Sequence, residues 1–343
     1  RNFRVGEGGE PNPWGAGTLE FLPQDVYSTR SIPHITSRDT LWDQPNLAEE
    51  VESGQHYLPN EPTGGRETIV TSAIEAKPQY VVQMPGPGWA HVCAAVFTAA
   101  CFLLLTIKVV TLAVICAGIA VVSCLVWVWD IDKGPDKGPV DIGGGHRLPV
   151  YMTGPSAHGW WAMIVLMTVA GSLYLAYLFS YLYTWTVTPE VWPDAADELA
   201  SLRWPALSAL SFVCGAAVYW FAQKSLGPRS ARHALTPGLL LLGALLISAG
   251  LGFEIYGHWS AGLRGPQSSF DALTYMASFL TGEIVVAILI MAVYVTARHF
   301  TGKLDNVRFA SLENTNLLVY YMTAQALIGL VMVHGFPRLV GAS

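Results

Sequence analysis

The stretch "GWAHVCAAVFTAACFLLLTIKVVTLAVICAGIAVVSCLVWVW", Gly88 to Trp129, decides the fold. It runs for 42 residues and carries one charged side chain, Lys108. About 20 apolar residues cross the hydrocarbon core of a bilayer, so this stretch is long enough to cross twice. An ammonium group costs several kcal/mol at the bilayer centre but little at the interface. The sequence therefore predicts a tight helical hairpin with Lys108 at its tip.

Five more apolar runs of membrane-spanning length follow the hairpin. They cover residues 157–186, 204–223, 237–258, 270–298 and 312–338. The whole chain is 52% hydrophobic and 13% charged, a composition typical of membrane proteins. We expect an all-α, polytopic membrane bundle with seven transmembrane helices, of which two form the hairpin and five form a bundle.

Residues 1–86 have a different composition and contain no apolar run of spanning length. They hold nine prolines and 12 Asp and Glu against 6 Lys and Arg, whereas the rest of the chain holds 13 of each. An extended, loop-rich arm is expected, and its acidity argues against nucleic acid or anionic lipid headgroups as partners. Regularly spaced apolar residues such as Leu19 and Trp42 favour an arm that lies on a protein surface over a disordered tail.

The predicted organisation has four segments. Residues 1–86 form the arm, 87–130 the hairpin, 131–156 a Gly- and Pro-rich linker, and 157–343 the five-helix domain. Loops on the linker side of the membrane carry nine Lys and Arg, and those on the opposite side carry four. By the positive-inside rule, the arm is expected in the cytoplasm and the C-terminus outside. The chain begins at Arg1 without a signal-peptide pattern, which suggests a part of a longer product.

No familiar catalytic or metal motif occurs. The triple glycine Gly143 to Gly145 lacks the G-K-[ST] of a phosphate loop, and GxSxG and HExxH patterns are missing from the sequence. The five cysteines lie in apolar runs and are expected to be free thiols. The nine histidines lie in the arm, in loops or near span ends, and none pairs with another on one helix. We therefore expect surface or interfacial histidines and no metal ligands.

Two carboxylates lie more than two residues inside a predicted span. Glu254 is near the outer end of the 237–258 span, and Glu283 is near the middle of the 270–298 span. Ionisable groups inside a membrane are expensive, so a functional or pairing role is the default for both. Glu254 could contact Tyr256, His258 or water at the headgroups. Glu283 could bond hydroxyl groups such as those of Thr281 or Thr323. Aromatic residues of the first of the five spans, such as Tyr174 and Tyr177, are expected to pack with hydroxyls bonded across helices.

The arm contains two specific stretches, "NPWGAGTLEF" and "SIPHITSRDTLWDQP". They resemble the segment that follows the twelfth transmembrane helix of haem-copper oxidase subunit I, whose usual form is close to N/D-P-W-x-A-x-T-L-E-W. The matching residues are Asn12, Pro13, Trp14, Ala16, Thr18, Leu19 and Glu20, with Phe21 in place of the usual Trp. The Ile-Pro-x-x-x-S-R-x-x-L-W pattern recurs from Ile32 to Trp42 and includes Arg38. In that family, the segment lies against the cytoplasmic side of the oxidase.

The five-span region resembles subunit III of the same oxidases. The stretch "HGWWAMIVLMTVAGSLYLAYLFSYLY" is similar to the first helix of a five-helix subunit III, and Glu254 in "GFEIYGHW" sits like that family's glutamate near a helix end. Departures also occur, because the first helix lacks the family's usual carboxylate and the last two helices lack its histidine-bearing stretches. These departures argue against a proton-related role for the five-span region. Packing, lipid binding and assembly remain as its expected roles.

The resemblance implies the back end of a fused subunit I/III polypeptide in a bacterial-type inner membrane. The parent enzyme would pass electrons from cytochrome c, with quinol as the alternative donor, to dioxygen while moving protons. Its haem and copper would be held by the adjoining subunit I core, and this chain would support that core beside subunit II and bind phospholipid. The alternatives are an independent seven-helix transporter or receptor and, third, an enzyme acting on lipid, for which no nucleophile and base are evident.

Overall fold

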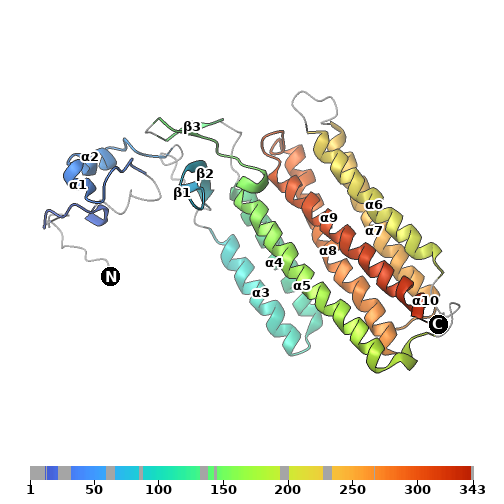
Figure 1. Cartoon of the computed structure of the whole chain (residues 1–343). Coiled ribbons are helices and arrows are strands. Elements are labelled where there is room, and N and C mark those ends of the chain that lie inside the picture. The colour runs from blue at the N-terminus through green and yellow to red at the C-terminus, as the bar shows by residue number, and fades with distance from the viewer. Residues whose placement is uncertain are drawn as a thin grey trace. The chain divides into compact units, whose positions relative to one another are not determined.

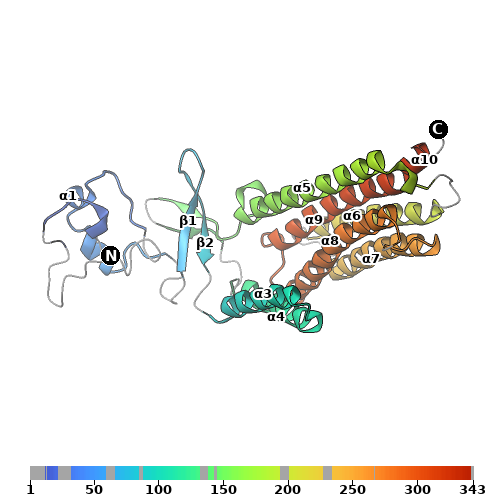
Figure 2. The ribbon, with the colours of Figure 1, turned by 90° about the horizontal axis from the view of Figure 1, so that it is seen from below.

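The computed structural model describes residues 12, 14–21, 32–58, 66–84, 88–131, 138–142, 145–193, 201–226, 234–265 and 267–340. The chain divides into two compact units, Arg1–Met152 and Thr153–Ser343. The boundary between the units falls inside the predicted linker. Figure 1 and Figure 2 show the elements of each unit from two directions.

The first unit begins with a small helical fold in the arm. It comprises the 3-10 turn η1 (Leu19–Phe21) and the short helices α1 (Thr40–Asp43) and α2 (Leu47–Glu52). Leu47 and Val51 on one face of α2 are 1% and 0% exposed and pack against Leu19, Ile35 and Leu41. The arm therefore has a small core of its own here.

A β-hairpin follows and was not predicted. Strands β1 (Arg66–Thr71) and β2 (Pro78–Met84) pair antiparallel. Their sequences "RETIVT" and "PQYVVQM" are rich in the β-branched residues and tyrosine that suit strands, a signal that the proline count of the arm obscured. In the linker, β3 (Val140–Asp141) and β4 (Arg147–Leu148) also pair, and the Val81 N–H donates to the Pro149 carbonyl at 3.0 Å. The linker strands thus form a second small sheet that one backbone hydrogen bond joins to the arm hairpin.

The predicted helical hairpin is present in the first unit. Helix α3 (Ala90–Thr106) and helix α4 (Val110–Ile131) pack against each other. Lys108 lies in the turn between them with a φ of 61°. Helix α3 has 17 residues, which at 1.5 Å per residue is about 26 Å, slightly short of a hydrocarbon core of about 30 Å.

The second unit is a helical bundle. Its helices are α5 (His158–Val187), α6 (Arg203–Lys224), α7 (Thr236–Ser260), α8 (Ser269–Phe300) and α9 (Ala310–Leu330), and α9 continues through a π-helical turn, η7 (Val331–Gly335), into α10 (Phe336–Val340). Short 3-10 turns, η3 (Gly154–Ser156) and η4 (Pro189–Val191), flank α5. These five continuous helical rods match the five predicted spans to within two residues at each end.

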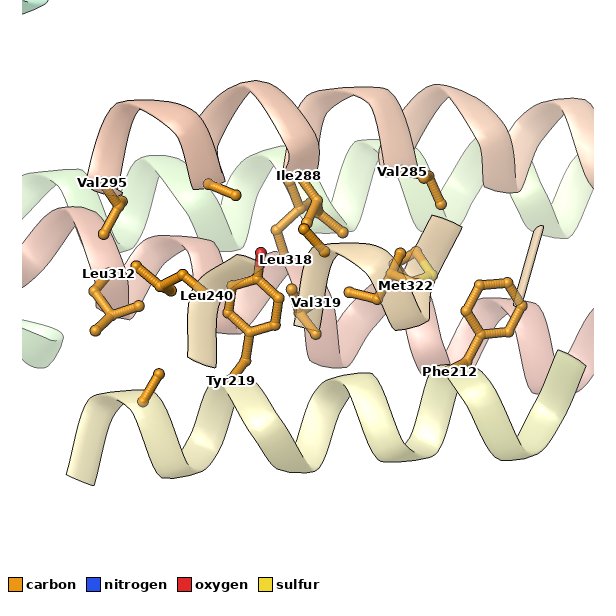
Figure 3. Close-up of a cluster of buried hydrophobic side chains, with 14 of the residues drawn as sticks. Phe212, Tyr219, Leu240, Val285, Ile288, Val295, Leu312, Leu318, Val319 and Met322 are labelled. Carbon is orange, nitrogen blue, oxygen red and sulfur yellow. The ribbon is translucent and has the colours of Figure 1, made fainter. Parts of the chain in front are cut away.

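The core of the bundle lies between α6, α7, α8 and α9. Figure 3 shows Phe212, Tyr219, Ile288 and Met322 converging there, and each of these four is 0% exposed. Asn316 of α9 adds a polar link, because its amide donates to the Gln223 side chain of α6 at 2.7 Å. Such hydrogen bonds between membrane helices add to the packing of side chains.

Glycines on α7 permit the close approach of α6. A Cβ atom added at Gly243 would lie 2.7 Å from the Tyr219 ring, and one at Gly250 would lie 2.8 Å from the Phe212 ring. A Cβ at Gly257 would lie 2.8 Å from Trp204, whereas Gly252 has nothing within 4 Å. Three of these four glycines therefore lie where α6 comes close, and Gly252 does not.

Six helices of the described residues are long and apolar enough to cross a membrane, namely α4, α5, α6, α7, α8 and the rod from Ala310 to Val340. The shorter α3 is the predicted seventh span, and its crossing stays a prediction. The molecule is thus mostly helical and has the length and apolarity of a multi-pass membrane protein.

Candidate functional site

A buried polar cluster, the Glu254 cluster, lies inside the second unit where α7 ends and α8 begins. It comprises Glu254 and His258 of α7, Ser278 of α8 and His334 of η7. Glu254 is 5% exposed, and its Oε1 atom accepts the Ser278 hydroxyl at 2.8 Å. The Glu254 Oε2 atom is buried and has no hydrogen-bond partner among the described residues. Half of this carboxyl group is therefore left unpaired.

Two histidines complete the cluster. His258 lies one helical turn after Glu254, and its Nε2 atom is 3.8 Å from Glu254 Oε1, too long for a direct hydrogen bond. The His258 ring stacks on the His334 ring with centroids 5.2 Å apart and planes 11° apart. The two residues are 0% and 4% exposed, and both ring nitrogens of His258 and Nε2 of His334 are without a partner in the described part of the chain.

The π-helical turn η7 places His334 in the cluster. Pro337 has no N–H to donate to the carbonyl four residues before it, and Phe336 instead donates to the Val331 carbonyl five residues back. The wider turn is held from the other side by Arg338, whose guanidinium donates to the His334 carbonyl at 2.6 Å. The sequence "HGFP" thus converts the end of the last helix into a local bulge that presents an imidazole inward.

More unpaired hydroxyl groups come from α5 and α8. Tyr174 and Tyr177 of α5 are 5% and 6% exposed, and Thr274 of α8 is 0% exposed. None of the three hydroxyls has a hydrogen-bond partner among the described residues. The predicted ring packing is confirmed, since Tyr174 and Tyr177 have centroids 5.4 Å apart. The predicted bonding of these two hydroxyls across helices is wrong. The Tyr181 hydroxyl accepts the Trp192 indole N–H at 3.3 Å, but Trp192 follows the turn η4 and is not on another helix.

The loop between α7 and α8 is anchored close to the cluster. Ser268 caps α8 by accepting the Asp271 N–H at 3.0 Å, and the Asp271 carboxylate accepts the Arg264 N–H at 2.7 Å. Tyr275, whose ring meets the His258 ring edge to face at 5.7 Å, donates its hydroxyl to the Leu263 carbonyl at 3.1 Å. The loop is therefore fixed to the same helix that supplies Ser278.

This arrangement corrects the expectation for histidines. Surface or interfacial positions were expected for all of them, and this is wrong for His258 and His334 because the fold brings together two histidines from different helices. Within the described residues, no group of three or more His, Cys, Asp or Glu side chains could hold a metal ion. Parallel stacking explains this for the two imidazoles, since stacked rings do not direct their nitrogens to one point. The Glu254 cluster is suited to hydrogen bonding and proton exchange.

Sequence reasoning identified Glu254 but missed Ser278 and His334. The contact with His258 could be expected, because residues four apart lie on the same face of a helix. Tyr256, the other suggested neighbour, is 48% exposed and packs on Trp204 instead. Ser278 and His334 lie 24 and 80 positions from Glu254 in the sequence, and no local pattern marks them.

Glu283 lies in a different environment. It is exposed on α8, whereas the suggested partners Thr281 and Thr323 are 2% and 8% exposed. No hydrogen bond or ion pair joins Glu283 to any residue that the structure describes. Its exposed neighbours along the outward side of α8 are apolar and lie three or seven residues apart: Met276, Phe279, Val286, Val293 and Phe300. Glu283 is thus the one carboxylate in this outward stripe of α8.

The two arm stretches that carry the resemblance fold together. The Trp42 indole donates to the Gly15 carbonyl at 2.8 Å, and the Leu41 N–H donates to the Gly17 carbonyl at 2.8 Å. A Cβ at Gly17 would lie 2.8 Å from the Trp42 ring, so glycine is required there. Asn12 closes the preceding turn by bonding Ala16 with both its amide N and O, at 2.8 and 2.9 Å.

The remaining predicted interface residues are placed as follows. Trp14 is 75% exposed and Trp42 is 66% exposed, and Glu20 and Arg38 are also exposed. Thr18 and Leu19 are half-buried. Pro13 lies outside the described residues.

Comparison with known proteins adds no family assignment, because no protein-family model and no curated protein matches this chain. The fold alone defines the class: a mostly helical chain with several helices able to span a membrane. Two features stand out within that class, the buried Glu254 cluster and the outward-facing Glu283.

Proposed function

We propose that this chain is a non-redox supporting part of an aerobic terminal oxidase, the haem-copper type that its arm resembles. In this proposal, the haem and copper lie in an adjoining subunit I core, and the chain stabilises that core and binds phospholipid. The parent reaction is electron transfer from cytochrome c to dioxygen, coupled to proton translocation. The chain lies in the inner membrane with its arm in the cytoplasm.

The observation that carries the proposal is the outward position of Trp14 and Trp42 on an ordered fold. The surrounding segment has its own small core and hydrogen bonds, yet two large indole rings are 75% and 66% exposed. Exposed tryptophans on a rigid support are typical of protein contact sites. The partner surface that the resemblance implies for these tryptophans is the cytoplasmic face of the subunit I core.

Glu283 gives independent support for a partner inside the membrane. A carboxylate on a lipid-exposed helix face is costly, and such groups usually face protein or water. The apolar stripe around Glu283 has the spacing of a helix-packing face. A transmembrane helix of the core that brings a hydroxyl, amide or guanidinium donor to this depth would remove the cost.

Replacement of Trp14 by Ala tests the arm contact. Trp14 touches Phe21 at 5.9 Å between ring centroids, so the arm should keep its fold while it loses the indole surface. We expect about tenfold or greater loss of the partner that co-purifies with the full chain, the loss that removal of a contact hot spot produces. The matched control is Ile74→Ala, at a side chain that is 96% exposed in the turn of the arm hairpin. Equal partner recovery in both variants would contradict the proposal.

An independent transporter is the second candidate, and the buried polar Glu254 cluster favours it. Intramembrane ionisable groups mark solute and ion pathways in transporters. The chain reconstituted alone in vesicles would then move a solute. Transport that survives Trp14→Ala and Glu283→Leu would support this candidate over the oxidase proposal.

A further inference from the structure

We infer that the Glu254 cluster is a hydrated proton-binding site, in which ordered water joins the unpaired polar atoms and one proton is shared between Glu254 and His258. The inference goes beyond the proposed supporting role. It rests only on the second unit, and so it holds whichever complex the chain belongs to.

Several buried polar atoms in and around the Glu254 cluster have no hydrogen-bond partner. Glu254 Oε2, both nitrogens of His258, His334 Nε2 and the Thr274, Tyr174 and Tyr177 hydroxyls are buried without a partner among the described residues. A buried polar atom without a hydrogen bond is destabilising, so the four unpaired atoms of Glu254, His258 and His334, whose side chains lie against one another, are not tolerated dry. Buried water bonds two to four polar atoms at once and is the usual solution.

The total charge of the buried Glu254–His258 pair sets the number of protons that it holds. Glu254 and His258 are 5% and 0% exposed, and an isolated charge in such a site costs several kcal/mol. The pair is neutral with one proton, either as carboxylic acid beside neutral imidazole or as carboxylate beside imidazolium. In the first state the O–H on Oε2 donates to water. Transfer moves that proton through water to a His258 ring nitrogen and leaves the carboxylate, with no change in total charge.

The shared proton belongs to His258 rather than to His334. The other groups around the cluster are Tyr174 and Tyr177 from α5, Asp271 and Tyr275 from α8, and Arg338 from α10. Arg338 donates to the His334 carbonyl at 2.6 Å, and its positive charge disfavours a second cation on His334. The Asp271 carboxylate is engaged by Ser268 and by the Arg264 N–H. His334 is then the neutral ring on which His258 stacks.

Infrared difference spectra of the full chain, isolated with whatever partner it retains, test the inference. Measured near neutral pH, the wild type should show a carboxylic-acid carbonyl band that is lost in Glu254→Gln, a substitution that keeps the shape and the bond from Ser278. In His258→Gln the proton has one site left, so the Glu254 band should gain intensity. In His334→Gln the band should change little. A water O–H band that shifts in H₂¹⁸O should weaken in Glu254→Gln.

Controls separate this site from other effects. Glu283→Gln removes the second intramembrane carboxyl group and should leave the response to His258→Gln unchanged. A carboxylate signal from Glu254 in the His258→Gln variant would contradict the inference that Glu254 and His258 share one proton. If no water O–H band changes in Glu254→Gln, the inference that the cluster contains ordered water is wrong. If Glu254→Gln does not fold, Ser278→Ala gives the second measurement, because loss of that hydroxyl should shift the Glu254 band. Partner recovery, which tests the proposed function, does not enter these outcomes.

Discussion

Glu254 and Glu283 are both carboxylates within helices long enough to span a membrane, yet the bundle treats them in opposite ways. Glu254 is enclosed and bonded by Ser278, whereas Glu283 points out of its own unit into an apolar stripe. The difference follows from helix phase, because Glu283 lies on the face of α8 that carries Phe279 and Val286, which are 60% and 56% exposed. One carboxylate is therefore a candidate for internal chemistry and the other for contact with a partner.

Glu283→Leu separates a partner contact from exposure to lipid. If a donor of the partner bonds Glu283, the leucine variant should lose assembly by about tenfold or more, since a hydrogen bond to a charged group is worth about 1.5–3 kcal/mol. If the side chain faces lipid, leucine removes a cost and assembly should be unchanged or improved. Partner recovery from solubilised membranes measures the effect, with Val286→Leu on the same stripe as the control.

Asp305 gives a pH prediction outside the membrane-spanning segments. Burial by itself raises the pKa of this carboxyl group, but N–H donors of Arg308 and Val307 and the Arg308 guanidinium, 2.8 Å away, outweigh burial and lower the pKa below its usual value. A lowered pKa in the folded state stabilises the fold above the unfolded pKa of about 4, and this stabilisation is lost as pH falls below it.

Asp305→Asn should therefore destabilise the α8–α9 loop at neutral pH and have a smaller effect when the pH falls below about 4. Thermal unfolding of wild type and variant at both pH values measures the difference. Glu313→Gln, a second carboxyl group near the start of α9, tests whether the response is general. An Asp305→Asn effect that grows as pH falls would contradict the assigned sign.

At the scale of elements, the glycines of α7 fix how closely α6 and α7 pack. Gly243→Ala places a methyl group where the Tyr219 ring now lies 2.7 Å from the Cβ position. Overpacking of this kind costs about 1–3 kcal/mol. Gly252→Ala on the same helix meets nothing within 4 Å and gains helix propensity, so it should be neutral or stabilising by up to about 1 kcal/mol.

Unfolding of the two alanine variants in mixed detergent gives the comparison directly. Gly243→Ala should unfold at a lower fraction of denaturing detergent than wild type, and Gly252→Ala should not. Equal stabilities would show that the α6–α7 contact adapts without cost, and the close-packing account would then be wrong.

For the whole molecule, the sequence predicted the parts that depend on local pattern. Continuous apolar runs predicted the five rods of the second unit, and Lys108 predicted the turn between α3 and α4. The spacing of Glu254 and His258 on one helix made their proximity foreseeable. The sequence could not show which residues of different helices lie together. For this reason it did not predict that His334 lies in the Glu254 cluster or that Glu283 is exposed on α8. The arm hairpin was missed because prolines around it outweighed its short strand pattern.

We propose that the haem and copper belong to a larger partner protein. The most direct measurement is a visible spectrum of the full chain, tagged and purified from its native membrane with its partners, recorded before and after the partners are dissociated. We expect haem absorbance in the intact complex that leaves with a larger protein and is absent from the separated chain. Haem that stays with the separated chain, or an intact complex without haem, would contradict the proposed supporting role.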